Sequence, residues 1–106
     1  MAIAEVFTYS PRPGGIEQFL GLAKRADKIL RALGATTRTM TSVAGGPTAN
    51  AFMYIVETPN WKAYGELSAK LDSDHDWRKF LADVTSNDKP AVDLVSSAVY
   101  AEIPLG

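Results

Sequence analysis

The sequence predicts an α+β fold in which helices cover one face of a four-stranded antiparallel sheet. Apolar residues alternate with a period of two in four segments and recur every three to four residues in the segments between them. The order of these segments is β-α-β-β-α(α)-β, which is the order of a ferredoxin-like sandwich. A chain of 106 residues has room for one such core, so we expect a single domain over residues 1–106.

The first strand and the first helix follow from local signals. Residues 3–10 mix apolar, aromatic and threonine side chains and stop at a Pro-Arg-Pro-Gly-Gly run, whose prolines lack backbone donors. From Ile16 to Leu33 the apolar residues fall on one face of a helix. Gly34 suits a left-handed C-terminal cap, so the helix is predicted to end there.

Three further strands complete the predicted sheet. Residues 36–43 and 50–57 flank a stretch with two glycines and a proline, which predicts a hairpin turn at residues 44–48. Residues 94–103 are predicted as the closing strand, which Pro104 stops.

Two helix starts are predicted between the third and the fourth strand. Thr58 is expected to cap a helix over residues 60–71, with Pro59 at its first position. Ser73 followed by Asp76 resembles a capping box and predicts a second start almost at once.

The predicted strands carry two unlike sets of side chains. One set is small or aliphatic: Ala4, Val6, Ala51, Met53, Ile55, Val95 and Val99. The alternate set is aromatic and acidic: Glu5, Phe7, Tyr9, Phe52, Tyr54, Tyr100 and Glu102. We expect the aliphatic set to pack on the helices and the aromatic set to face a second copy of the sheet, which gives a homodimer whose lumen can hold a ligand.

The opening of the chain resembles that of NIPSNAP-like proteins. The resemblance is carried by Glu-Val-Phe-Thr-Tyr at residues 5–9 and by Pro-Gly-Gly-Ile-Glu-Gln-Phe-Leu at residues 13–20. The glycine pair of the hairpin, the helix with Trp61 and Tyr64, and the last strand agree in order with that family and with the wider dimeric α+β barrel group. The resemblance implies a barrel made of two facing sheets.

Five polar strand residues are candidates for ligand binding: Glu5, Tyr9, Arg38, Tyr54 and Tyr100. The tyrosine hydroxyls can hydrogen-bond a small aromatic molecule on which neighbouring phenylalanines stack, and Arg38 can neutralise a ligand carboxylate or pair with Glu5 or Glu102. Packing at a dimer interface accounts for the tyrosines equally well, and an arginine on a strand more often extends to solvent.

His75 is the one histidine and a weaker candidate for a catalytic base. It lies among Asp72, Asp74 and Asp76 at the predicted helix start, where the favoured interpretation is a polar ring in water. The acidic spacing imitates a calcium loop, but Trp77 takes the place of its glycine, so we expect no metal site. With no cysteine and no glycine-rich phosphate loop, no cofactor is expected.

Net charge and hydropathy limit the kinds of partner that we expect. The net charge is −1, and the basic residues of the first helix lack interleaved aromatics, so nucleic acid is not an expected partner. No apolar run approaches the roughly 20 residues that cross a bilayer, and no signal peptide is recognisable. The lack of cysteine fits the reducing cytoplasm.

Three functional interpretations stay open at this point. The first is a protein that binds a small apolar or aromatic molecule in its cavity. The alternative is a cofactor-independent monooxygenase or isomerase acting on a phenolic or polyketide-like substrate, in which one polar group removes a proton. The third is a purely structural subunit whose aromatic sheet face is a dry interface.

Overall fold

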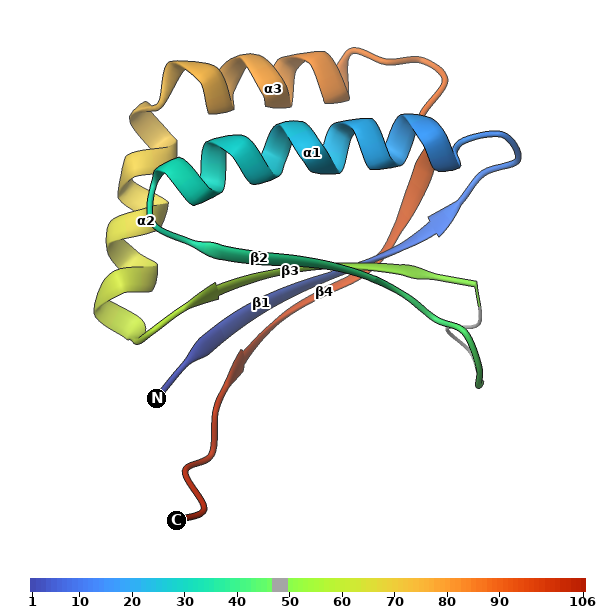
Figure 1. The fold of residues 1–106 in the computed structure, drawn as a ribbon. Coiled ribbons are helices and arrows are strands. Elements are labelled where there is room, and N and C mark those ends of the chain that lie inside the picture. The colour runs from blue at the N-terminus through green and yellow to red at the C-terminus, as the bar shows by residue number, and fades with distance from the viewer. Residues whose placement is uncertain (47–49) are drawn as a thin grey trace.

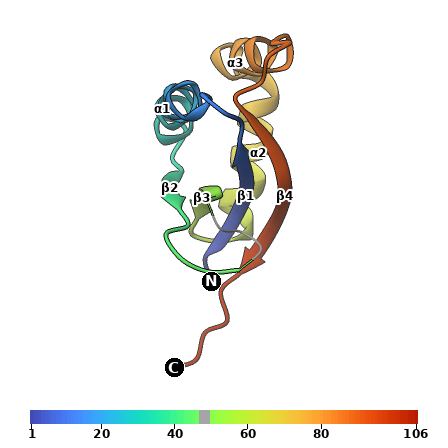
Figure 2. The ribbon, with the colours of Figure 1, turned by 90° about the vertical axis from the view of Figure 1, so that its right-hand side faces the viewer.

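The computed structural model, which describes residues 1–46 and 50–106, has one sheet with all its helices on one side (Figure 1). The strands are β1 (Ile3–Pro11), β2 (Thr36–Thr41), β3 (Phe52–Thr58) and β4 (Val92–Ala101). The helices are α1 (Ile16–Ala32), α2 (Trp61–Ser73) and α3 (His75–Thr85). Helices α1 and α3 run side by side above the sheet, and α2 descends at one end of it (Figures 1 and 2).

The sheet is antiparallel throughout, with the strand order β2-β3-β1-β4. This order confirms the ferredoxin-like fold, because α1 connects β1 to β2 and β3 lies between these two strands in the sheet. The predicted pairing of the second and third strands is confirmed. The turn predicted at residues 44–48 includes residues 47–49, which lie outside the described residues.

The cap predicted for α2 is wrong. The helix begins at Trp61, and its cap is Asn60, whose Oδ1 accepts a hydrogen bond of 2.8 Å from the backbone N–H of Ala63. Thr58 is the last residue of β3 and is buried, so it is not free to cap a helix. Asparagine satisfies a free N–H of the first turn as well as threonine does.

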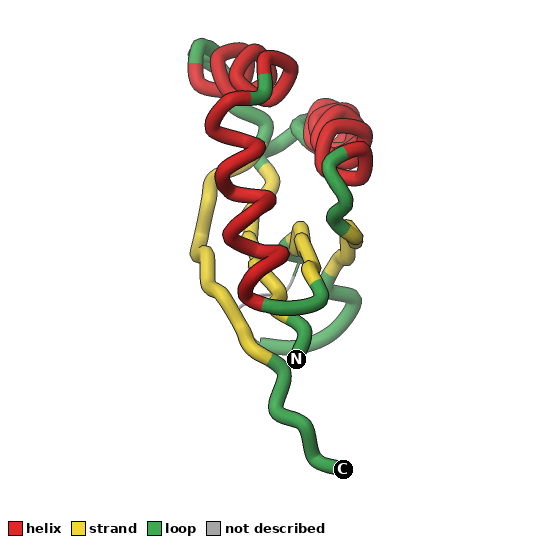
Figure 3. Tube along the Cα trace, turned by 90° about the vertical axis from the view of Figure 1, so that its left-hand side faces the viewer, coloured by secondary structure: helices red, strands yellow, loops and turns green. Residues whose placement is uncertain are grey.

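The cap predicted for α3 is also wrong by one residue. Helix α2 continues through Ser73, and Asp74 caps α3 by accepting a hydrogen bond of 2.8 Å from the backbone N–H of Trp77. Asp76 lies in the first helical turn, where its negative charge interacts favourably with the helix dipole. The break between α2 and α3 is therefore a single extended residue (Figure 3).

Two glycines fix the ends of α1. Gly34 has φ of 98° just beyond the helix, which confirms the predicted C-terminal cap. Gly15 precedes the helix, and a Cβ built there would lie 2.1 Å from the carbonyl oxygen of Ala91. The same oxygen accepts a hydrogen bond of 2.9 Å from the N–H of Arg12, so the loop after β1 lies directly on the start of β4.

The helices cover the aromatic set of side chains and not the aliphatic one, so the predicted assignment of the two faces is wrong. We call the covered side the helix face; it carries Glu5, Phe7, Tyr9, Phe52, Tyr54, Val56 and Val99. Helix α1 approaches this face with Ala23 and Ala26, and large rings on the sheet complement those small residues. The ring of Phe19 stacks on that of Phe52 at 4.9 Å and meets Tyr9 at 5.4 Å.

The other side, which we call the open face, has no helix over it (Figure 1). It carries Ala4, Val6, Arg38, Met40, Met53, Ile55, Glu57, Ala98 and Tyr100. On β4 the predicted grouping is wrong, because Val99 is paired with Glu5 and Tyr100 is paired with Ala4. A register shift opposite Thr8 and Tyr9 adds one residue to β4, and simple alternation does not reveal it.

None of the helices among the described residues combines the length and the apolar character needed to span a membrane.

Candidate functional site

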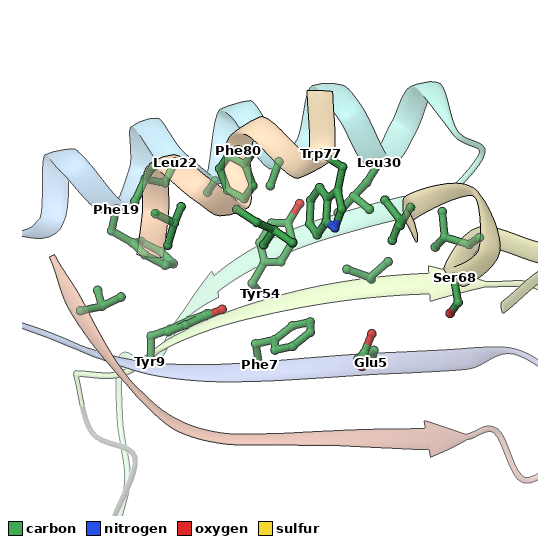
Figure 4. Close-up of a pocket in the computed structure, with 18 of the residues that line it drawn as sticks. Glu5, Phe7, Tyr9, Phe19, Leu22, Leu30, Tyr54, Ser68, Trp77 and Phe80 are labelled. Atoms are coloured by element: carbon green, nitrogen blue, oxygen red, sulfur yellow. The ribbon is translucent and has the colours of Figure 1, made fainter. Parts of the chain in front are cut away.

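A cavity of about 260 Å³ lies between the helix face and the helices (Figure 4). Alternate residues of β1 and β3 form its floor, and side chains of all three helices form its roof. Helix α3 lies against α1 and α2 above the sheet, and its side chains Trp77 and Phe80 point towards the helix face (Figure 4). The volume lies just below the range of roughly 300–1,000 Å³ that is usual for sites of drug-sized molecules.

The structure brings together three of the five predicted binding residues, Glu5, Tyr9 and Tyr54, which all line this cavity. It places Arg38 and Tyr100 on the open face, across the sheet from the other three. Arg38 forms an ion pair with Glu57 of the neighbouring strand, not with Glu5 or Glu102 as predicted. The cause is the pairing of Arg38 with Ile55, which points away from the helices.

His75 is the first residue of α3, and it is exposed. It does not line the cavity, although Trp77, two residues further on, does. This is the position that the surface interpretation of His75 expects.

Glu5 gives the cavity one polar end. Burial raises the pKa of its carboxyl group, and the hydroxyl of Tyr64 on α2 lowers that pKa by a smaller amount. The pKa of Tyr64 is in turn raised, first by burial and then by the charge of Glu5. Ser68, one turn further along α2, lines the same end of the cavity in Figure 4.

Tyr54 stands in the floor of the cavity, but its hydroxyl is already engaged. It donates a hydrogen bond of 2.6 Å to Oδ1 of Asp27 on α1. Burial, and then this carboxylate, raise the pKa of the phenol. Arg31 lies close by and donates to Oγ1 of Thr37 at 2.9 Å and to its carbonyl oxygen at 2.8 Å. Tyr54 therefore offers a ligand its ring more than its hydroxyl.

The end of the cavity away from Glu5 is apolar and aromatic. Tyr9 and Phe19 lie there in Figure 4, and Phe7 lies between them and Glu5 on the same strand. Burial raises the pKa of the Tyr9 phenol, so this residue stays neutral in the physiological range. Rings at this end can stack on an aromatic ligand.

The roof of the cavity includes side chains that were not predicted as ligand-binding residues. Tyr64 and Trp77 line the cavity, whereas Trp61 is 53% exposed and lies outside it. Ser68 was missed, although it lies four residues after Tyr64 and so on the same helix face. Within residues 1–46 and 50–106, no group of three histidine, aspartate or glutamate side chains is placed to hold a metal ion.

Comparison with known proteins identifies solved structures that share the fold of this chain. No protein-family model and no curated protein matches the sequence. A NIPSNAP family protein of unknown function from Agrobacterium tumefaciens superposes with a TM-score of 0.70 and 19% identity, over 99% of this chain and 91% of that one. An uncharacterized NIPSNAP domain protein from Burkholderia xenovorans gives 0.69 and 16% identity, over 98% of this chain and 97% of that one.

This chain has the fold of NIPSNAP proteins. The resemblance read from its first twenty residues is thereby confirmed for the fold of nearly the whole chain. This chain also superposes on a protein described as an antibiotic biosynthesis monooxygenase, with a TM-score of 0.59 and 10% identity over 96% of this chain and 99% of that one. At such identities the likeness concerns the fold and leaves the chemistry to be argued from the cavity.

Proposed function

We propose that this chain is a NIPSNAP-like protein that binds a small apolar or aromatic molecule in the cavity between its sheet and its helices. The observation that carries this proposal is the composition of the cavity, whose walls are mostly rings and aliphatic chains with a polar group at one end. A few placed polar groups in an apolar hollow are typical of sites that bind and orient small molecules.

The two tryptophans allow a direct test, since Trp77 lines the cavity and Trp61 does not. Their indole N–H groups give separate signals in a proton–nitrogen correlation spectrum, and a Trp61→Phe variant assigns them. We expect naphthylmethanol, a neutral two-ring probe, to shift the Trp77 signal with saturation and to shift that of Trp61 less. If the Trp77 signal stays in place up to the solubility limit of the probe, ligand binding is contradicted and the structural interpretation gains.

A filled cavity provides the control. Ala26 is buried on α1 and lines the cavity, so Ala26→Leu puts three more carbons into the space that the probe would occupy. Ala82 on α3 is exposed, and Ala82→Leu adds the same atoms outside. We expect the first variant to lose the probe-induced shift of Trp77 and the second to keep it, with both folded spectra retained.

We also propose that a second copy of the chain covers the open face. Val6 and Met53 make its centre aliphatic, while Met40 and Tyr100 are 49% and 58% exposed. A sheet face of this composition is usually covered by something. Sedimentation equilibrium should give a dimer for the wild type and a folded monomer for Met53→Lys. A monomeric wild type at high concentration would contradict this part of the proposal.

A second candidate function is the removal of a proton from a phenolic or polyketide-like substrate, followed by oxygenation or isomerisation without a cofactor. Two observations favour it: the fold likeness to the antibiotic biosynthesis monooxygenase, and Glu5 as a carboxylate base inside an aromatic cavity. An electron-rich anion formed there can itself reduce dioxygen. Oxygen uptake with a dihydroxynaphthalene should then occur with the wild type and fail with Glu5→Gln. No uptake and no isomerised product would leave only the binding function.

A further inference from the structure

The cavity has a charge of one sign. Glu5 is the only charged residue that lines it, and no lysine, arginine or histidine does so within residues 1–46 and 50–106. Two basic side chains that lie near lining residues, Arg25 at Phe80 and Arg31 at Tyr54, are already engaged. Arg25 forms an ion pair of 2.9 Å with Asp83, and Arg31 is held by hydrogen bonds to Thr37. An anionic ligand would therefore enter an apolar space, find no positive partner and meet a carboxylate.

The walls of the cavity favour the opposite charge. Phe7, Tyr9, Tyr64, Trp77 and Phe80 surround it with aromatic rings, whose faces attract cations. Phe80 already makes such a contact, because the guanidinium of Arg25 lies 5.2 Å from its ring centre. Rings alone do not repay the cost of moving a cation out of water, but rings together with a carboxylate can.

Glu5 also has capacity to accept more hydrogen bonds. A carboxylate accepts about four, and among residues 1–46 and 50–106 Tyr64 is the side chain whose hydrogen bonding lowers the pKa of this carboxyl group. This distinguishes Glu5 from Asp27, the other carboxylate near the cavity, which is engaged with the Tyr54 hydroxyl. An ammonium group at Glu5 would add donors where acceptors are available, including the hydroxyl oxygens of Tyr64 and Ser68.

We propose that the cavity selects organic cations, and that its ligand is an amine, protonated at neutral pH, on an apolar or aromatic body. The ammonium group lies at Glu5, and the body extends past Phe7 towards Tyr9. These residues alternate along β1, and Glu5 and Tyr9 are four positions apart, about 13 Å at 3.3 Å per residue. That length suits a compact two-ring body with a short arm. This inference rests on the proposed binding function and names the class of ligand for the same site.

The test uses three probes that share one naphthyl body and differ in charge: naphthylmethylamine, naphthylmethanol and naphthoate. Dissociation constants are measured from the Trp77 indole signal at neutral pH. We expect the amine to bind about tenfold more tightly than the alcohol, as for a hydrogen bond between charged groups, and the carboxylate to bind most weakly.

Matched variants assign the preference to one carboxyl group. Glu5→Gln keeps the shape of the side chain and should bring the amine and the alcohol to within about twofold of each other. Glu66→Gln removes the same charge from the exposed surface of α2, outside the cavity, and should leave the tenfold preference intact. Glu5→Asp keeps the charge and should retain a preference for the amine, which guards against a general disturbance caused by any substitution at this position.

The outcomes separate the two levels of the proposal. If the alcohol binds and the amine binds no more tightly, cation selection is contradicted and the binding function stands. If Glu5→Gln keeps the full preference, or Glu66→Gln loses it, Glu5 is not the group that recognises the cation. If no probe moves the Trp77 signal, the binding function itself is contradicted.

Discussion

The two faces of this sheet are made by the same strands, yet they have opposite characters. The helix face carries rings and one carboxylate and encloses a hollow, whereas the open face carries mostly aliphatic side chains, Tyr100 and the Arg38–Glu57 ion pair. The face with the aromatic rings is thus covered by helices but not completely filled. Helix α3 lies beside α1 above the sheet, and the side chains of both helices line the cavity together with the rings of the helix face. Side-chain size alone does not show which face of a sheet is tightly packed.

The largest effect that tests this comparison is the loss of a core leucine. Leu30 on α1 is 2% exposed and packs above the helix face, whereas Met53 is partly buried on the open face. We expect Leu30→Ala to lower the free energy of unfolding by about 3 kcal/mol. At protein concentrations too low for a dimer, Met53→Ala should lower it by about 1 kcal/mol, since less area is lost from contact. Urea unfolding measures both, and equal losses would mean that the open face is as fully covered as the helix face.

The elements themselves were predictable because periodicity and turn chemistry are local. The apolar steps from Ile16 to Leu33 defined α1, and Gly34 ended it at a positive φ that few other residues accept. The caps were less predictable. Thr58 and Ser73 are good cap residues by type, but each is still inside the preceding element, and Asn60 and Asp74 take the role.

The site could be predicted only in part, because alternation tells which residues share a face and not which face the helices cover. Glu5, Tyr9 and Tyr54 were grouped correctly since they lie on β1 and β3, whose pairing has no irregularity. Tyr100 was not, because it pairs with Ala4 on the open face, and its own strand does not show which residue of β1 lies opposite it. Only long-range pairing contains that information.

A smaller effect is expected from removing one hydroxyl on each face. Tyr54→Phe deletes the donor to Asp27 and should cost about 1.5 kcal/mol of unfolding free energy, as for a hydrogen bond to a charged group. Tyr100→Phe removes a hydroxyl from a ring that is 58% exposed and should change stability by less than about 0.5 kcal/mol. Naphthylmethanol should bind the Tyr54→Phe variant as it binds the wild type, because the ring remains. A lost affinity would show that the hydroxyl turns from Asp27 to the ligand.

Glu5 should make stability depend on pH in an unusual direction for a carboxylate. Burial raises its pKa above the usual value of 4.5, so the folded state holds this proton more tightly than the unfolded state does. The contribution of Glu5 to stability is therefore fully present below about pH 4.5 and is lost as the pH rises through the raised pKa. Glu5→Gln should be slightly more stable than the wild type at about pH 7 and equal to it at about pH 3. Urea unfolding at the two pH values measures this, and a variant that is less stable at about pH 7 would show that the ionised carboxylate stabilises the fold.

The smallest effect in the isolated chain is expected from the ion pair of the open face, and it is the most informative about assembly. The side chains of Arg38 and Glu57 are 57% and 32% exposed, so a double-mutant cycle with Arg38→Ala and Glu57→Ala should give a coupling of about 0.5 kcal/mol or less. If a second copy covers this face, the Arg38–Glu57 ion pair is shielded from water. Replacing one of the two residues then leaves an unpaired buried charge, which lowers stability much more than in the monomer. The coupling should then grow with protein concentration through the range in which the dimer forms, and added salt should weaken it less there than in the monomer. A coupling that stays small at every concentration, in a protein shown to be dimeric, would place the dimer contact away from the open face.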